Sequence, residues 1–309
     1  MPPFKTYSKG KRRSVALWTE YYLAQTVTDA LQTLAEAPGS ARVIAGGTDL
    51  MLDLQQGRHP PVDTLVDVTN IPELTSLELR QGSLFIGAGV PLNKIIETPI
   101  VNEHAQALIE ACRLIGGPQV RNTATLGGNV AHALPAGDGT ISLLSLGAMA
   151  EVARARERKF LQLTDLFLGP GQSALEPRAE ILVGFIIPLK SPGEASVFQR
   201  VMRPQGVAIA ILNMAVWIKR ADDRILDSRI AVGPSGSTPK RASNTEAFLK
   251  GKHLDEKILS QAKETLLSES HFRTSPHRAT SEYRRHISGV LLEETLSIAW
   301  MRAEDQADS

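Results

Sequence analysis

Two glycine pairs, about eighty residues apart, constrain the fold of this chain more than any other feature. The first lies in AGGTDL, Ala45–Leu50, and the second in TLGGN, Thr125–Asn129. Each pair lies near a small polar side chain, Thr48 in the first segment and Thr125 and Asn129 in the second. A glycine at a strand end permits a positive φ and lets a ligand approach the main chain closely. Successive backbone N–H groups in such a loop can bind an anion without any lysine.

One glycine pair is most simply a turn, but two such loops from distant parts of the chain could hold a long diphosphate between them. Dinucleotide cofactors have that shape. The alternative is two tight turns that bind nothing. The segment GAG at Gly87–Gly89 lacks the third glycine of a dinucleotide-binding fingerprint, because Leu92 stands there. We therefore expect GAG to form a turn after a strand.

The order of apolar patterns predicts an α+β chain with a composition change near Pro188–Gly193. Before this point, strands and helices alternate, which is typical of α/β structure. Helices are expected at 28–37, after Asp49, and at 102–115. Beyond it, strands are followed by helices, with Asn244 and Asp255 as expected N-caps and a last helix at 281–300. We expect a tail at 1–18, a larger domain at 19–190 and a smaller domain at 194–302.

Composition excludes several classes of function. Cys112 is the only cysteine, so the chain cannot ligate an iron–sulfur cluster by thiolates. Cys112 lies at helical spacing with Leu108 and Ile109, which predicts a buried apolar thiol. The seven histidines are scattered, and we expect no metal site. The net charge of +1 gives no reason to expect nucleic acid. No apolar stretch is long enough to span a membrane, and no export signal is evident, so we expect a cytoplasmic protein.

Several longer segments, in this order and spacing, make a combination that is specific. They are AGGTDL, GGPQVRNTATLGGNVA (Gly116–Ala131), PAGD with LLSLGA after it, EILVGFIIP (Glu180–Pro188) and YRRHISGVLLEETL (Tyr283–Leu296). From about Glu20 to Trp300 the chain resembles the FAD-binding medium subunit of the molybdenum hydroxylases, as in carbon monoxide dehydrogenase and bacterial xanthine dehydrogenases. The resemblance implies a PCMH-type flavin domain of the vanillyl-alcohol-oxidase fold, built from two α/β subdomains. It also implies a smaller C-terminal α+β domain and one non-covalent FAD.

The resemblance also implies which residues contact FAD. Asp138 matches an acid that binds sugar or ribityl hydroxyls, and Leu182 matches an apolar residue near the adenine. Ile115 and Gly117 match residues that approach the cofactor, although plain core packing is an equal alternative for Leu182 and Ile115. Both glycine loops match segments at the diphosphate: Ile44, Ala45, Gly46, Gly47, Thr48, Asp49, Leu50, Thr125, Leu126, Gly127, Gly128 and Asn129.

The implied function is electron transfer within a heterotrimer. A molybdopterin-containing large subunit would oxidise the substrate, and a 2Fe-2S small subunit would carry single electrons to the FAD of this chain. The acceptor stays open among NAD, oxygen, quinone and a carrier protein, and no catalytic acid–base pair is needed. One alternative is a free-standing FAD-dependent oxidoreductase of the same fold. Another is a nucleotide-binding regulatory module without turnover.

Overall fold

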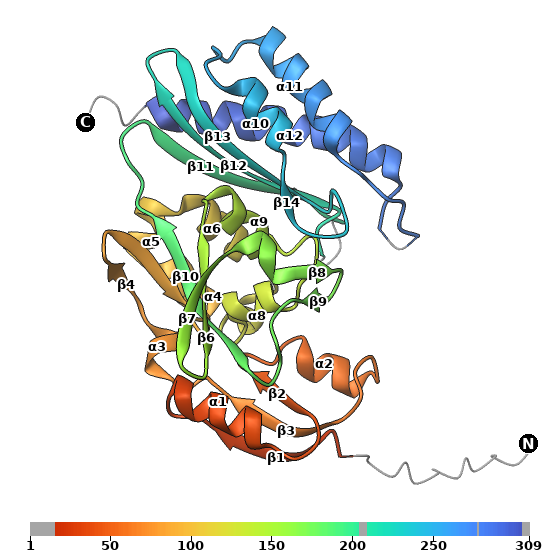
Figure 1. Ribbon diagram of the computed structural model, residues 1–309. Coiled ribbons are helices and arrows are strands. Elements are labelled where there is room, and N and C mark those ends of the chain that lie inside the picture. The colour runs from red at the N-terminus through yellow and green to blue at the C-terminus, as the bar shows by residue number, and fades with distance from the viewer. Residues whose placement is uncertain (1–15, 204–208, 277, 305–309) are drawn as a thin grey trace, which may run out of the picture.

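The computed structural model describes residues 16–203, 209–276 and 278–304 (Figure 1). Most of the expected N-terminal tail therefore lies outside the described residues. Three main sheets follow one another along the part of the chain that the structure describes. No helix among the described residues is long and apolar enough to cross a membrane.

A parallel three-stranded sheet of order β1–β3–β2 begins the described part of the chain. Helix α1 places Ala30, Leu31 and Leu34 in the core, and the Thr26 side chain caps it by accepting a 3.1 Å bond from Asp29 N. This confirms the helix expected at 28–37. The elements of this part are β1 (Trp18–Leu23), α1 (Val27–Glu36), β2 (Ala41–Ile44), α2 (Leu50–Gln55), β3 (Val62–Asp67) and α3 (Pro72–Thr75).

An antiparallel five-stranded sheet of order β4–β5–β10–β6–β7 forms the middle of the molecule. Its strands are β4 (Leu77–Arg80), β5 (Ser83–Gly87), β6 (Met149–Arg154), β7 (Glu157–Gln162) and β10 (Glu180–Pro188). The turn expected at GAG follows β5, as predicted. The other elements here are α4 (Leu92–Glu97), α5 (Pro99–His104), α6 (Gln106–Leu114), α7 (Pro118–Arg121), α8 (Leu126–Ala131), α9 (Asp138–Ser145), a 3-10 turn at Leu163–Leu166, β8 (Phe167–Gly169) and β9 (Gln172–Ser173).

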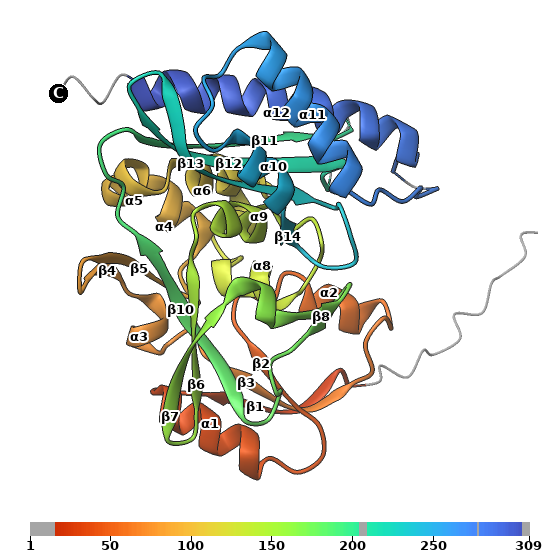
Figure 2. The same cartoon turned by 45° about the horizontal axis from the view of Figure 1, so that its top comes forward.

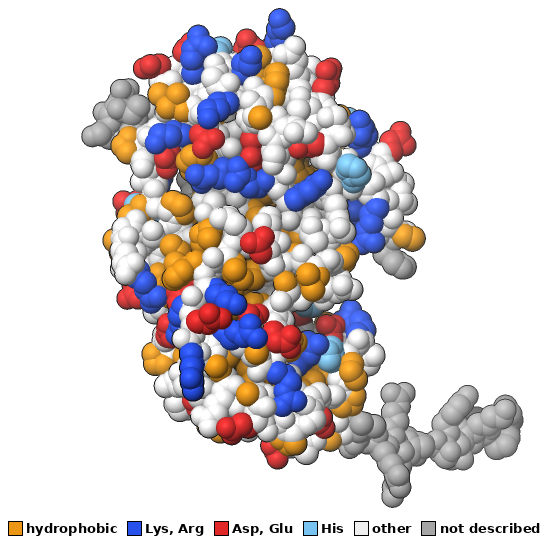
Figure 3. Space-filling model, in the orientation of Figure 1, with side chains coloured by type: hydrophobic (Ala, Val, Ile, Leu, Met, Phe, Trp, Pro, Cys, Tyr) orange, Lys and Arg blue, Asp and Glu red, His pale blue; other side chains and the backbone are white. Residues whose placement is uncertain are grey.

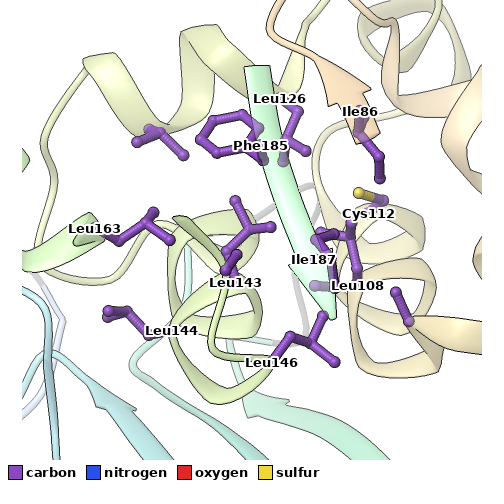
Figure 4. Packing of buried hydrophobic residues seen from close by; sticks show 14 of the residues in the cluster. Ile86, Leu108, Cys112, Leu126, Leu143, Leu144, Leu146, Leu163, Phe185 and Ile187 are labelled. Carbon is purple, nitrogen blue, oxygen red and sulfur yellow. The ribbon is translucent and has the colours of Figure 1, made fainter. Parts of the chain in front are cut away.

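The main core lies between β10 and the helices beside it (Figure 4). Phe185 and Ile187 of β10 are fully buried there, and Cys112 of α6 is buried in the same cluster, as predicted. The single helix expected at 102–115 is wrong, because Ala105 has φ −141° and ψ 52° and separates α5 from α6. Ala105 is fully buried, and the change of direction lets each helix turn its own apolar side into the core.

An antiparallel four-stranded sheet of order β11–β12–β13–β14 completes the fold. Helix α12 covers one face of this sheet, and α6 and α9 lie against the other face (Figures 1 and 2). The strands are β11 (Glu194–Val201), β12 (Leu212–Ala221), β13 (Arg224–Gly233) and β14 (Lys240–Arg241), and the helices are α10 (Ser243–Leu249), α11 (Glu256–Glu269) and α12 (Ser281–Glu304).

The two helix caps expected in this part had different outcomes. Asp255 caps α11, because its side chain accepts a 2.8 Å bond from Ile258 N. The cap expected at Asn244 is wrong, because Asn244 lies inside the first turn of α10. There the carboxylate of Glu269 accepts the N–H groups of Asn244 and Thr245 at 3.0 and 2.9 Å. A carboxylate that is distant in the sequence therefore accepts the first N–H groups of α10, in place of a local capping side chain.

Candidate functional site

The two glycine loops meet in space. Residue Gly46, two residues after the end of β2, lies against the backbone of Thr123 and Ala124, just before the second loop. A Cβ added at Gly46 would overlap the carbonyl oxygen of Thr123, so only glycine permits this approach. The sequence indicated a shared role for the loops, and the fold brings them into contact.

The first loop presents backbone donors. Residue Gly47 has φ +65°, a left-handed conformation that favours glycine. Among the residues that the structure describes, nothing accepts a hydrogen bond from the backbone N–H groups of Gly46, Gly47, Thr48 or Asp49. The helix expected after Asp49 is α2, and Asp49 stands at its N-cap position but makes no side-chain capping bond. Consecutive N–H groups without protein acceptors form a fitting cradle for a diphosphate.

The second loop differs from the first, because backbone N–H groups in it already donate to acceptors within the protein. The Gly127 N–H donates to the carbonyl of Ala88 at 2.8 Å, and Gly128 N–H donates to Thr125 Oγ1 at 3.0 Å. A Cβ at Gly127 would lie 2.5 Å from Ala88 Cβ, whereas a Cβ at Gly128 would meet only Thr125 Oγ1, at 3.2 Å. Gly127 therefore packs against the turn after β5. Gly128 lines the cavity and has room beside it.

A cavity of about 220 Å³ lies beside the two loops. Five residues predicted from the sequence line it: Ala45, Thr125, Gly127, Gly128 and Leu182. Its other lining residues are mostly apolar, with one basic and one acidic side chain: Arg42, Val43, Val68, Leu74, Ala88, Gly89, Ala131, Ser173, Leu175, Pro177, Glu180 and Ile181. An apolar wall beside a backbone cradle suits a ligand with a flat ring and a charged linker.

Asp138 lies outside this cavity, at the start of α9. The carboxylate is buried and pairs with the guanidinium of Arg200, and Asn213 Nδ2 donates to its other oxygen at 2.6 Å. Burial raises the pKa of Asp138, while the charge of Arg200 and the bond from Asn213 oppose this rise. The carboxylate thus joins α9 to β11 and β12.

Family models cover almost the whole described chain. The model described as "FAD binding domain in molybdopterin dehydrogenase" matches residues 14–190, more than half of the chain. The model described as "CO dehydrogenase flavoprotein C-terminal domain" matches residues 196–299. This chain belongs to the FAD-binding medium subunits of the molybdenum hydroxylases. Its cofactor is FAD, and it is an oxidoreductase flavoprotein subunit with the predicted α+β fold.

Individual relatives agree with this assignment. The putative xanthine dehydrogenase FAD-binding subunit XdhB of Escherichia coli K12 is 31% identical over 285 residues, which cover 91% of this chain and 96% of the relative. The nicotine 6-hydroxylase medium subunit of Paenarthrobacter nicotinovorans is 32% identical over 283 residues, covering 91% and 97%. Carbon monoxide dehydrogenase of Hydrogenophaga pseudoflava superposes with a TM-score of 0.88 at 26% identity, covering 93% of this chain and 99% of that one.

The remaining predicted residues of this FAD subunit do not line the cavity. Ile44 and Leu126 are buried in hydrophobic clusters, so their side chains pack in the core. Asn129 Oδ1 accepts a 3.3 Å bond from the backbone N–H of Thr140 in α9. The full set outside the lining is Ile44, Gly46, Gly47, Thr48, Asp49, Leu50, Ile115, Gly117, Leu126, Asn129 and Asp138.

The loop of Ile115 and Gly117 depends on an arginine that sequence reasoning missed. Arg121 Nη1 donates to the carbonyls of Ile115 and Gly116 at 3.2 and 2.8 Å. Residue Gly116 has φ +55°, so the chain reverses there and turns these carbonyls toward the guanidinium. Arg121 belongs to α7 and not to the last turn of α6, so no local rule in the sequence pairs it with these carbonyls.

Other residues at the site were harder to predict from the sequence. Ala88 and Gly89 line the cavity, and their only sequence signal was the GAG segment that we read as a turn. Arg200 and Asn213 hold Asp138 from 62 and 75 residues away along the chain. Nothing local in the sequence pairs them with Asp138, because the contact depends on how the sheet β11–β14 packs against α9.

Proposed function

We propose that this FAD subunit receives electrons from iron–sulfur clusters in a partner subunit and passes them to an external acceptor. The observation that carries the proposal is the cavity, with free backbone donors of Gly46–Asp49 beside it and Gly128 in its wall. FAD supplies the redox chemistry, because a flavin can collect single electrons and release a pair. The chain has one cysteine, and that thiol is buried, so the clusters belong on another chain.

The proposed roles of the residues follow from their positions. The first loop would bind the diphosphate through its backbone N–H groups, and the second would receive it against Gly128. Leu182 would pack on the adenine, and Asp138 would accept a bond from a sugar or ribityl hydroxyl, since each carboxylate oxygen can accept more than one bond. The residues proposed to contact FAD are Ile44, Ala45, Gly46, Gly47, Thr48, Asp49, Leu50, Ile115, Gly117, Thr125, Leu126, Gly127, Gly128, Asn129, Asp138 and Leu182.

The proposed partners are a molybdopterin-containing large subunit and a 2Fe-2S small subunit. Relatives carry the names "medium chain" or "medium subunit" in carbon monoxide dehydrogenase and nicotine 6-hydroxylase, which supports a chain of intermediate size in a larger assembly. The proposed domain boundaries are 19–190 for the FAD-binding domain and 194–302 for the C-terminal domain. The acceptor is left open.

A purification from the native host through a tag on this chain tests the proposal. We expect FAD, molybdenum and iron in constant ratio through size-exclusion chromatography, together with a cysteine-rich chain. A complex carrying Gly128→Val should keep its molybdenum and iron, and dithionite should still bleach its iron–sulfur absorbance, but acceptor reduction should be lost. A chain that elutes alone with FAD and reduces an acceptor without partners would overturn the proposal and favour a free-standing flavoenzyme.

A further inference from the structure

Arg284 is a buried cation without a counterion in the part of the chain that the structure describes. It is the fourth residue of α12 and is 1% exposed. Its Nε and Nη1 atoms have no hydrogen-bond partner, and no carboxylate lies within ion-pair distance of it among the described residues. Burying a guanidinium without a partner is strongly unfavourable, so a buried arginine in this state points to a missing anion.

Two other arginines add positive charge around Arg284. Burial lowers the pKa of Arg284, and the positive charges of Arg278 and Arg273 lower it further. Arg273 is exposed, Arg278 is half-buried and Arg284 is buried. Figure 3 shows basic side chains at this edge of the C-terminal domain, near the connection that enters α12.

The connection between α11 and α12 is held in a compact turn. Ser275 N–H donates to the carbonyl of Ala279 at 2.9 Å, and Arg278 N–H donates to the carbonyl of Ser275 at 3.1 Å. Thr274 Oγ1 accepts a 3.0 Å bond from Ser281 N, which joins the turn to the start of α12. These bonds hold the backbone of Arg278, and of Thr274 next to Arg273, before any ligand arrives, which reduces the entropy lost on binding.

Arginine side chains, rather than the helix N-terminus, are the available donors. Thr280 accepts the Tyr283 N–H with its hydroxyl at 3.1 Å and the Arg284 N–H with its carbonyl at 3.2 Å. The first turn of α12 is therefore already capped. The site is also separate from the FAD site, because α12 covers the opposite face of its sheet from α9 and Asp138.

We propose that Arg284, Arg278 and Arg273 form a binding site for a phosphate-type oxyanion at the head of α12. A tetrahedral dianion offers enough acceptor oxygens for three guanidinium groups, whereas one carboxylate offers two. Arg284 binds the anion at the bottom of the site, and Arg278 and Arg273 bind it at the mouth. The free anion and the phosphate group of a nucleotide share this chemistry.

The test uses the full chain saturated with FAD, so that the diphosphate loops are occupied. Inorganic phosphate is titrated by calorimetry in chloride buffer of constant ionic strength, and AMP is titrated in parallel. We expect one phosphate per chain. Arg278→Gln should weaken this binding about 10- to 100-fold, because each charge-assisted bond is worth roughly one to two powers of ten. The matched control Arg224→Gln removes an exposed arginine on β13 and should change nothing. Tighter binding of AMP than of phosphate would identify a nucleotide as the source of the anion.

Arg284→Met provides an independent test that does not depend on measuring affinity. If the anion is the missing partner, this variant should melt at an equal or higher temperature than the parent in phosphate-free buffer, because an unpaired buried charge has been removed. Phosphate should then raise the melting temperature of the parent and leave that of the variant unchanged. Failure of the parent chain to bind phosphate or AMP, or a variant that melts lower with and without phosphate, would overturn the proposal.

Discussion

Gly128→Val separates loss of the cofactor from loss of the fold. In the structure, a Cβ at this position meets only Thr125 Oγ1, at 3.2 Å, and otherwise faces the cavity. Valine is a somewhat better helix former than glycine, by a few tenths of a kcal/mol, and the Thr125 cap would weaken by a similar amount. We therefore expect the unfolding free energy of the FAD-free chain to change by less than about 1 kcal/mol.

The effect on FAD should be much larger. A valine side chain in the cavity wall would move the diphosphate away from the backbone donors of Gly46–Asp49, and a shift of about 1 Å takes an N–H···O bond beyond its working range. Two bonds to a charged group are worth about 3–6 kcal/mol together. The dissociation constant for FAD should therefore rise about 100- to 10,000-fold.

Flavin fluorescence quenching measures the affinity, and circular dichroism with urea unfolding measures the fold. Gly236→Val is the matched control, because a Cβ there meets nothing closer than Lys240 Cε at 3.6 Å and lies outside the cavity lining. Gly127→Val is the contrasting variant, because its Cβ would lie 2.5 Å from Ala88 Cβ and should destabilise the chain by about 1–3 kcal/mol. A Gly128→Val chain with parental affinity for FAD would refute this placement of the diphosphate.

Other predictions concern the packing around the site. Arg200→Met should lower the unfolding free energy by about 3–5 kcal/mol in urea titrations, because it leaves Asp138 charged and buried; a change below about 1 kcal/mol would show that the pair is not coupled. Burial raises the pKa of Cys112, so native protein should resist a disulfide reagent at pH 8 and react at once in urea; rapid native labelling would contradict its position. Asp255→Ala should cost about 1 kcal/mol through loss of the α11 cap, with Glu256→Ala as the neighbouring control.

Local chemistry in the sequence predicted the parts of the site that depend on neighbours along the chain. A glycine pair after a strand requires unusual backbone conformations, and Gly47 has the positive φ that this implies. Thr125 was predicted only as a small polar side chain beside the second pair, and the structure adds that its hydroxyl caps the Gly128 N–H. Cys112 at helical spacing with Leu108 predicted a buried thiol, and both side chains belong to the same core cluster.

Contacts that depend on packing between distant segments could not be predicted. The break at Ala105 has no glycine or proline to mark it, and it follows from how α5 and α6 pack against the core. The α10 cap comes from Glu269, about 25 residues later, so a rule based on neighbouring residues wrongly predicted Asn244 as the cap. The approach of Gly46 to Thr123 depends on the contact between two segments about 80 residues apart. Such contacts are decided by the tertiary fold, which short-range patterns do not encode.

The C-terminal domain takes part in positioning the second glycine loop. Asn129 of that loop accepts a bond from Thr140 of α9, and Asp138, two residues earlier in α9, pairs with Arg200 and Asn213 of the C-terminal sheet. Each member of this path is a buried or half-buried polar contact, and such contacts are costly to break and geometrically specific. The position of α9, and with it the orientation of the loop, therefore depends on the sheet packed against it. The FAD-binding domain thus holds the two glycine loops, while the domain that follows it fixes the helix behind one of them.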